Sequence, residues 1–177
     1  MIPAFDHLVG DRVVIQPFRL ADLTIDYVGW LNNPDVVRFS NQRFRSHSLE
    51  SCASYFQSFS GTPNQFLSIR LRSDDRAIGT MTVYASPQHG TADVGIMIGD
   101  PAQRGTGIGG DAWPLLIDWL IEAGGVRKVT AGTLRCNIAM VRLMQRSRMH
   151  EEAVRKAQEI VQGRSEDVLH YARFRTD

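Results

Sequence analysis

The stretch from Arg104 to Gly110 (RGTGIGG) is the part of the chain best suited to hold an anion. Glycine has no side chain, so its backbone N–H groups can approach a ligand closely. An amphipathic pattern follows directly, and the N-terminus of a helix adds about half a positive charge and unsatisfied donors. The loop therefore predicts a pyrophosphate site. Glycines at this spacing also occur where a chain only makes a tight turn, and on the loop alone that alternative stays open.

Two other phosphate-binding motifs share part of this pattern. The letters satisfy the dinucleotide fingerprint, which usually follows the first strand of its fold and is followed by an acid about 20 residues later. Here the loop comes after several hairpin strands, and the next strand ends Thr133-Leu134-Arg135 without an acid. No Gly-Lys-Ser/Thr follows the loop either, which excludes a P-loop.

The elements that must position this loop follow from the spacing of apolar residues. Strands are predicted over residues 12–18, 65–71, 77–85, 92–98, 127–134 and 168–174. Helices are predicted over residues 21–31, 35–39, 48–59 and 137–145, and a longer helix is predicted from within or just after the glycine loop to Gly124-Gly125. The linkers 72–76 and 86–90 are short enough for antiparallel hairpins.

Composition limits the class of protein. The 177 residues, 43% of them hydrophobic, suit one domain over residues 1–177 with a full core. A formal net charge of +1 gives no field that would attract nucleic acid or a membrane, so an anion must be held locally. Cys52 and Cys136 fit no metal or disulfide pattern and are expected as reduced thiols. Without an apolar leader or a bilayer-length run, we expect a cytoplasmic protein without a bound metal.

The predicted elements around the glycine loop follow one another in a fixed order. They are a strand over 92–98, the loop Arg104–Gly109 with the pattern R/Q-x-x-G-x-G/A, a helix, a strand over 127–134, and Asn137 at the start of a further helix. This order and spacing resemble the acetyl-CoA-binding core of the GNAT acetyltransferase superfamily. The resemblance implies an α/β (α+β) fold in which about four helices flank a mixed, mostly antiparallel sheet of about seven strands.

The front of the chain extends the resemblance. Gly10–Val13 (GDRV) and Trp30–Val36 (WLNNPDV) are similar to the branch that contains ribosomal-protein N-terminal acetyltransferases and amino-sugar acetyltransferases. The resemblance thus covers nearly the whole chain. It also favours a strand over residues 151–163, where propensity alone would allow a helix.

In this family the strand matching 92–98 separates from the strand matching 127–134, and its free backbone groups pair with the pantetheine arm of the cofactor. The resemblance assigns the oxyanion donor to the N–H near Ile98, the pyrophosphate to the glycine-loop amides, and a cofactor or water contact to Asn137. The implied cofactor-binding residues are Ile96, Met97, Ile98, Arg104, Gly105, Thr106, Gly107, Ile108, Gly109, Gly110 and Asn137.

Several positions depart from the family pattern. Met144 stands where many relatives have a tyrosine that protonates the leaving thiolate. Gly132 stands where some N-terminal acetyltransferases have an acid, and Arg148-Met149 replaces a Gly-Phe pair. Three arginines in or just after the helix predicted over residues 137–145 are either contacts for the outer phosphate of the cofactor or a solvated face: Arg142, Arg146 and Arg148.

An amine attacks a thioester only when it is unprotonated, so the reaction needs a base or a relay of waters, and an oxyanion donor. Asp93, on the strand expected to line the reaction centre, is the first candidate for the base, ahead of His89 and His47. Each has a structural alternative, because strand-end carboxylates often bond neighbouring amides and loop histidines are usually solvated. His170 is expected in packing or at the surface. The predicted catalytic groups are therefore Asp93 and the N–H of Ile98.

The expected reaction is acetylation of a small-molecule primary amine, such as the amino group of a nucleotide-linked sugar, by direct attack on acetyl-CoA in a ternary complex. Two alternatives stay open: acetylation of a protein N-terminus such as that of a ribosomal protein, and a non-catalytic acyl-CoA-binding domain, which the missing tyrosine allows. No acidic patch is evident for a basic ribosomal tail, which favours the small molecule. The oligomeric state is open, with a homodimer as one alternative.

Overall fold

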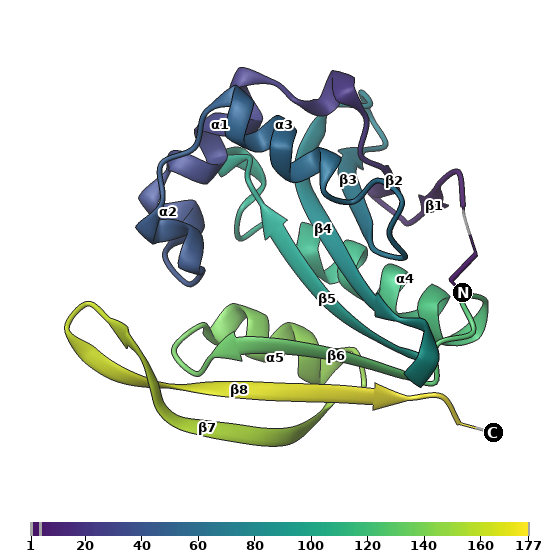
Figure 1. Ribbon diagram of the computed structural model, residues 1–177, viewed down its shortest axis with the longest axis vertical. Coiled ribbons are helices and arrows are strands. Elements are labelled where there is room, and N and C mark those ends of the chain that lie inside the picture. The colour runs from purple at the N-terminus through teal and green to yellow at the C-terminus, as the bar shows by residue number, and fades with distance from the viewer. Residues whose placement is uncertain (1, 4, 177) are drawn as a thin grey trace.

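One eight-stranded sheet runs through the computed structural model, which describes residues 2–3 and 5–176 (Figure 1). The strand order is β1-β2-β3-β4-β5-β6-β8-β7, and only β5 and β6 run parallel. The strands are β1 (Leu8–Val9), β2 (Val13–Pro17), β3 (Gln65–Leu71), β4 (Ala77–Ser86), β5 (Thr91–Ile98), β6 (Lys128–Leu134), β7 (His150–Val161) and β8 (Arg164–Phe174). The predicted mixed, mostly antiparallel sheet is confirmed, and the largely parallel sheet of a dinucleotide-binding fold is excluded.

Among the described residues, five α-helices accompany the sheet, with four short 3₁₀ helices between elements. The α-helices are α1 (Ile25–Asn32), α2 (Pro34–Val37), α3 (Leu49–Gln57), α4 (Ile108–Glu122) and α5 (Ile138–Arg146). The 3₁₀ helices are η1 (Leu20–Asp22), η2 (Asn41–Phe44), η3 (Pro87–His89) and η4 (Pro101–Gln103). Helix α3 begins after Ser48 as its cap, and the hydroxyls of Ser48 and Ser51 each accept a hydrogen bond from the backbone N–H of the other residue.

Two apolar cores hold the layers together. The larger one joins α4 and α5 to the sheet. The apolar face of α4 is buried in it, with Trp113 near one end of the face and Ile121 at the other. The smaller core joins α1 and α3 to the sheet through Tyr27, Cys52 and Phe66. The helices thus divide between two packing layers, and the sheet between them carries the loops that form the site.

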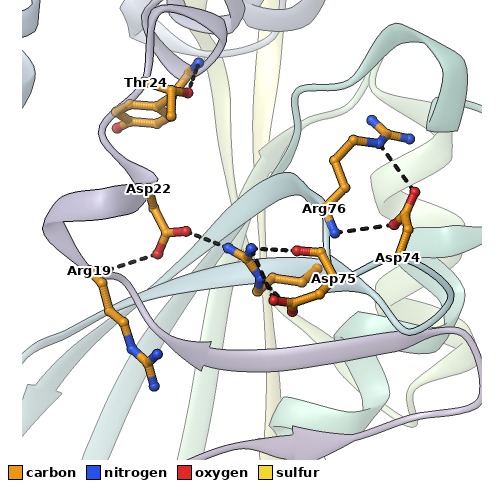
Figure 2. Close-up of polar contacts among 8 residues, drawn as sticks. Arg19, Asp22, Thr24, Asp74, Asp75 and Arg76 are labelled. Atoms are coloured by element: carbon orange, nitrogen blue, oxygen red, sulfur yellow. Dashed lines mark hydrogen bonds and ion pairs between the residues drawn. The ribbon is translucent and has the colours of Figure 1, made fainter.

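Two sequence predictions of helix and strand bounds were too coarse. The single helix predicted over 21–31 is broken, because the carboxylate of Asp22 accepts a hydrogen bond from the backbone N–H of Arg19 (Figure 2). It accepts another from the Arg70 guanidinium of β3. The chain therefore turns, and α1 starts later with Thr24 as its cap. The strand predicted over 151–163 is confirmed as β7, and its partner β8 begins four residues earlier than predicted, at Arg164.

Candidate active site

Strands β5 and β6 pair only at their beginnings, where Thr91–Asp93 lie beside Lys128–Thr130. Beyond these pairs the two strands separate, as Figure 1 shows. The N–H of Gly99 donates to the carbonyl of Ile78 on β4 (2.9 Å). Because alternate residues of an antiparallel strand bond the same neighbour, Ile96 and Ile98 turn their backbone groups away from β4 and toward the opening.

A cavity of about 1290 Å³ occupies this opening and continues to the glycine loop at one end and to α1 and α3 at the other. Of the predicted cofactor-binding residues, all but one line it: Ile96, Met97, Ile98, Arg104, Gly105, Gly107, Ile108, Gly109, Gly110 and Asn137. The exception is Thr106. The structure therefore brings together residues from β5, the loop and the start of α5 that are up to 41 positions apart.

The glycine loop presents its backbone N–H groups at the start of α4. Gly105 and Gly107 have φ of 77° and 85°, in the left-handed region that favours glycine, and Gly107 is the N-cap of α4. The N–H groups of Thr106 and Gly110 are bonded within the loop. Among the described residues, those of Gly105, Gly107, Ile108 and Gly109 have no partner. This arrangement is suited to a pyrophosphate.

Two loop side chains bond the protein itself. The Arg104 guanidinium donates to the carbonyl of Asp35 in α2 (2.6 Å), so it joins the loop to α2. The Thr106 hydroxyl donates to the carbonyl of Gln103 (2.8 Å). The backbone carbonyl of Thr106 accepts a hydrogen bond from the Arg12 guanidinium (2.9 Å). Sequence reasoning missed Arg12, which lies 94 positions away and forms no motif with the loop.

Asp111 also connects the start of β2 to the helix that follows the loop. Its carboxylate accepts hydrogen bonds from the backbone N–H groups of Asp11, Arg12 and Val13 at 2.7–3.1 Å. A Cβ on Gly10 would lie 2.7 Å from this carboxylate, so the turn needs a glycine there. The Gly10–Val13 stretch of the sequence resemblance thus has a structural role in holding the first turn of α4.

Helix α5 forms a further wall of the cavity. Asn137 caps it: Oδ1 accepts from the N–H of Met140, and Nδ2 donates to the hydroxyl of Thr133 (3.1 Å). Arg142 and Arg146 line the cavity, whereas Met144 is fully buried in the core and, as a thioether, has no proton to give. On this wall the structure therefore offers no general acid at the position of the family tyrosine.

Arg148 and Met149, which replace the Gly-Phe pair, lie in surroundings that would suit a glycine and a phenylalanine. Arg148 has a φ of 60°, the left-handed conformation that a glycine adopts freely, and Met149 is 2% exposed, as expected for a phenylalanine position. The backbone at Arg148 and the burial of Met149 are thus compatible with the pair that they replace.

Asp93 lies on β5 where the strands begin to separate, but it is not among the cavity-lining residues. Its carboxylate accepts a hydrogen bond from the Thr130 hydroxyl (2.7 Å). The residue is exposed on one side, yet the protein atoms around the carboxylate raise its pKa above the usual value, while the Thr130 bond and the charge of His170 act against this shift. A carboxylate with a raised pKa suits proton acceptance better than an ordinary surface aspartate.

The two other candidate bases lie elsewhere. His89 belongs to η3, in the turn between β4 and β5, and its carbonyl accepts from Arg127. The backbone N–H of His47 donates to Asn32 (2.9 Å), which ties the segment before α3 to the end of α1. Neither histidine lines the cavity.

The end of the cavity opposite the glycine loop is aromatic. Tyr27, Tyr55, Phe66 and Tyr84 line it, and the hydroxyls of Tyr55 and Tyr84 are 2.8 Å apart, within hydrogen-bond distance. Burial raises the pKa of Tyr27 and Tyr55, so both phenols stay protonated at neutral pH. This end can therefore receive a flat or apolar group and offer it hydroxyl hydrogen bonds.

Residues 12–150 match the family described as the Acetyltransferase (GNAT) domain, which is more than half of the chain. The chain belongs to the GNAT acetyltransferase family. Members of this family are N-acetyltransferases with acetyl-CoA as donor, so the family and the enzyme class expected from the sequence are confirmed. No helix among the described residues is both long and apolar enough to cross a membrane.

Individual relatives are distant. A probable N-acetyltransferase of Bacillus subtilis strain 168, YjcK, is 28% identical over 97 residues, which are 54% of this chain and 53% of that protein. The chain thus matches about half the length of this curated relative. Spermidine N-acetyltransferase from Vibrio cholerae, solved with CoA and spermine, has a TM-score of 0.81 at 16% identity and covers 92% of this chain and 95% of its own.

The ribosomal-protein-S5-alanine acetyltransferase from Vibrio fischeri also has a TM-score of 0.81 at 16% identity, over 97% of both chains. At these identities the likeness establishes the fold alone. The class of acceptor has to be argued from the residues that line the cavity.

Proposed function

We propose that this GNAT domain transfers an acetyl group from acetyl-CoA to a primary amine of a small molecule, by direct attack in a ternary complex. The observation that carries the proposal is the single cavity that joins the glycine loop, the opening between β5 and β6, and the aromatic end. Donor and acceptor can occupy such a cavity together, so no acetylated enzyme intermediate is required. The reaction would take place in the cytoplasm, where acetyl-CoA is made.

The cofactor would lie along the residues predicted from the sequence. The free N–H groups of the glycine loop would hold its pyrophosphate, and the backbone of Ile96–Ile98 would pair with the pantetheine arm. The N–H of Ile98 would donate to the thioester oxygen as negative charge develops there. Arg142 and Arg146 would meet the outer phosphate, since both line the cavity on the wall formed by α5.

Asp93 would remove a proton from the acceptor ammonium, because it is the carboxylate beside the opening and its pKa is raised. With Met144 buried and unable to donate, the sulfur would leave as a thiolate. A thiol pKa of about 8.5 makes the thiolate a tolerable leaving group.

The lining of the cavity argues for the class of acceptor. Among its described residues there is no Asp, Glu or Lys, so nothing there would neutralise a second ammonium group of a polyamine. The aromatic end offers rings for stacking a base, and Tyr55, Tyr84 and Thr82 offer hydroxyls that match a sugar. We therefore propose the amino group of a nucleotide-linked sugar as acceptor.

Two alternatives predict different results. A protein N-terminal acetyltransferase would prefer peptides, and the likeness in fold to the ribosomal-protein enzyme favours testing this. A non-catalytic domain would bind acetyl-CoA without turnover, as the missing tyrosine allows.

The experiment is an assay of thiol release from acetyl-CoA with three acceptors: a nucleotide-linked amino sugar, spermidine, and a peptide with an N-terminal alanine. We expect turnover with the first acceptor above both others. Preference for the peptide would support the protein acceptor instead. Micromolar acetyl-CoA binding without thiol release from any amine would support the non-catalytic domain, and tight NAD binding without acetyl-CoA binding would overturn the proposed cofactor.

A further inference from the structure

The imidazole of His170 on β8 lies over Gly132 on β6, beside the opening between β5 and β6. The two residues are register partners, and a Cβ atom on Gly132 would lie 3.5 Å from both Nδ1 and Cε1 of the ring. The ring therefore packs against the open side of Gly132, where a side chain at that position would point. Gly132 itself lines the cavity. A titratable group from β8 thus stands where the sequence of β6 has no acid.

Asp93 and His170 share one face of the sheet. Asp93 pairs with Thr130, which lies two residues before Gly132 on β6. Because alternate residues of a strand point to the same face, the partners of Thr130 and Gly132 lie on that face as well. The charge of His170 opposes the effect of burial on the pKa of Asp93, in keeping with their place on one face of the sheet.

The surroundings of His170 leave its two nitrogens unequal. Nε2 is buried and has no hydrogen-bond partner among the described residues, which is uncommon for a buried polar atom. Nδ1 is the nitrogen on the side of Gly132, which lines the cavity although His170 itself does not.

Few other charges surround the ring. The same-face neighbours on β8, Val168 and Ala172, are uncharged, and the register partner on β7 is Ala153. The charged residues next along β7 are Glu152 and Arg155. Of the two carboxylates, Glu152 is paired with Lys128, whereas Asp93 on β5 has no ion-pair partner among the described residues.

We propose that His170 is a second proton-accepting residue of the reaction centre and acts as a pair with Asp93. The proposal rests on the proposed acetyl transfer. The acceptor ammonium loses one proton to the Asp93 carboxylate, and the imidazole takes this proton over, so that the carboxylate is again charged and stabilises the imidazolium. The nitrogen lone pair then forms the bond to the acetyl carbon, the C–S bond breaks, and the sulfur leaves as a thiolate. The second proton of the nitrogen passes to that thiolate or to solvent.

The first test needs no acceptor, so it is independent of the proposed function. The pKa of His170 is measured by NMR from its Cε1–H resonance in the wild type and in Asp93→Asn. Removal of the opposite charge is expected to lower this pKa, because an anion nearby favours the charged imidazolium. His150, exposed on β7, serves as the internal control and should not change. An unchanged pKa of His170 in Asp93→Asn would overturn the pairing.

The second test compares His170→Gln with the control His150→Gln, using an acceptor that the wild type acetylates. His170→Gln is expected to lower kcat by about 10²-fold or more, with unchanged acetyl-CoA affinity. It should also remove from the pH profile of kcat/KM the limb that depends on an unprotonated imidazole. His170→Asn, a smaller neutral side chain, covers the case in which glutamine prevents folding. Turnover and a pH profile like those of His150→Gln would refute the proposal.

Discussion

The Arg12 guanidinium donates a hydrogen bond to the carbonyl oxygen of Thr106 at 2.9 Å, which fixes the glycine loop to the start of β2. The loop that is expected to hold the pyrophosphate is thus tethered from the opposite end of the sequence. Asp111 strengthens the same connection by binding the N–H groups before β2. The geometry of the loop therefore depends on residues that never contact the cavity.

Arg12→Ala should weaken acetyl-CoA binding by about 2- to 10-fold, since a net hydrogen bond contributes about 0.5–1.5 kcal/mol to loop position. Titration calorimetry measures this directly. Arg72→Ala is the matched control, because Arg72 binds the carbonyls of Gly10 and Asp11 in the same turn without contacting the loop. Equal affinities for the two variants would show that the tether does not shape the loop.

Gly109→Val should lower acetyl-CoA affinity by about 10- to 100-fold, because hydrogen bonds to a charged group contribute about 1.5–3 kcal/mol each and the side chain would block them. The fold should survive, since the nearest atom to an added Cβ is Leu143 Cδ2 at 3.7 Å. Gly107 is a poorer choice, because its φ of 85° would strain any other residue. Gly29→Val, in α1 and clear of neighbours, is the control. Full acetyl-CoA affinity in a folded Gly109→Val variant would show that the pyrophosphate does not bind at this loop.

Asp93→Asn should lower turnover and raise the melting temperature at neutral pH. The raised pKa means that the folded protein favours the neutral acid, so the stability from this group is present below its unfolded pKa and is lost as pH rises through the folded pKa. At neutral pH the ionised carboxylate thus costs stability, which asparagine avoids. Melting curves at pH 7 and near pH 3 test the sign: the gain should appear at pH 7 and vanish at the lower pH. A loss of stability at pH 7 would contradict this account.

Arg148→Gly should raise the free energy of unfolding by about 0.5–1 kcal/mol, because glycine adopts the positive φ of this position without the steric cost that a Cβ brings. Arg148→Ala keeps that cost and loses the exposed ion pair with Asp118, so it should be neutral or slightly destabilising. Urea unfolding of both variants provides the comparison. The expectation fails if the glycine variant is the less stable of the two.

Local patterns were sufficient for much of the fold. The strands at 65–71 and 77–85, the glycine loop and the buried face of α4 each follow from contacts between residues close in sequence, and the structure contains them as predicted. The break before α1 could not be predicted, because Asp22 turns the chain by binding Arg70, which lies 48 positions away. Propensity carries no information about such a partner.

The candidate site was likewise predictable only in part from the sequence. The loop residues form a motif, so the sequence alone indicated them, and ten of the eleven predicted cofactor residues line one cavity. His170 approaches Gly132 only because β6 pairs with β8 rather than with the next strand along the chain. A strand order of this kind is decided by packing of the whole sheet, and no spacing in the sequence encodes it.

The separation of β5 from β6 gives this sheet four edges where an ordinary open sheet has two. The outer edges are β1 and β7, and the inner two face each other across the opening. An unpaired edge invites another strand to add to it, which leads to aggregation when the edge is accessible. Here the inner edges begin in a paired corner at Asp93 and Thr130 and are flanked by packed helices, so a strand with side chains on both faces would have to enter a closed wedge. A narrow chain can reach the same main-chain groups, and the shape of the wedge therefore keeps these two inner edges from pairing with another strand while leaving their hydrogen-bonding groups available.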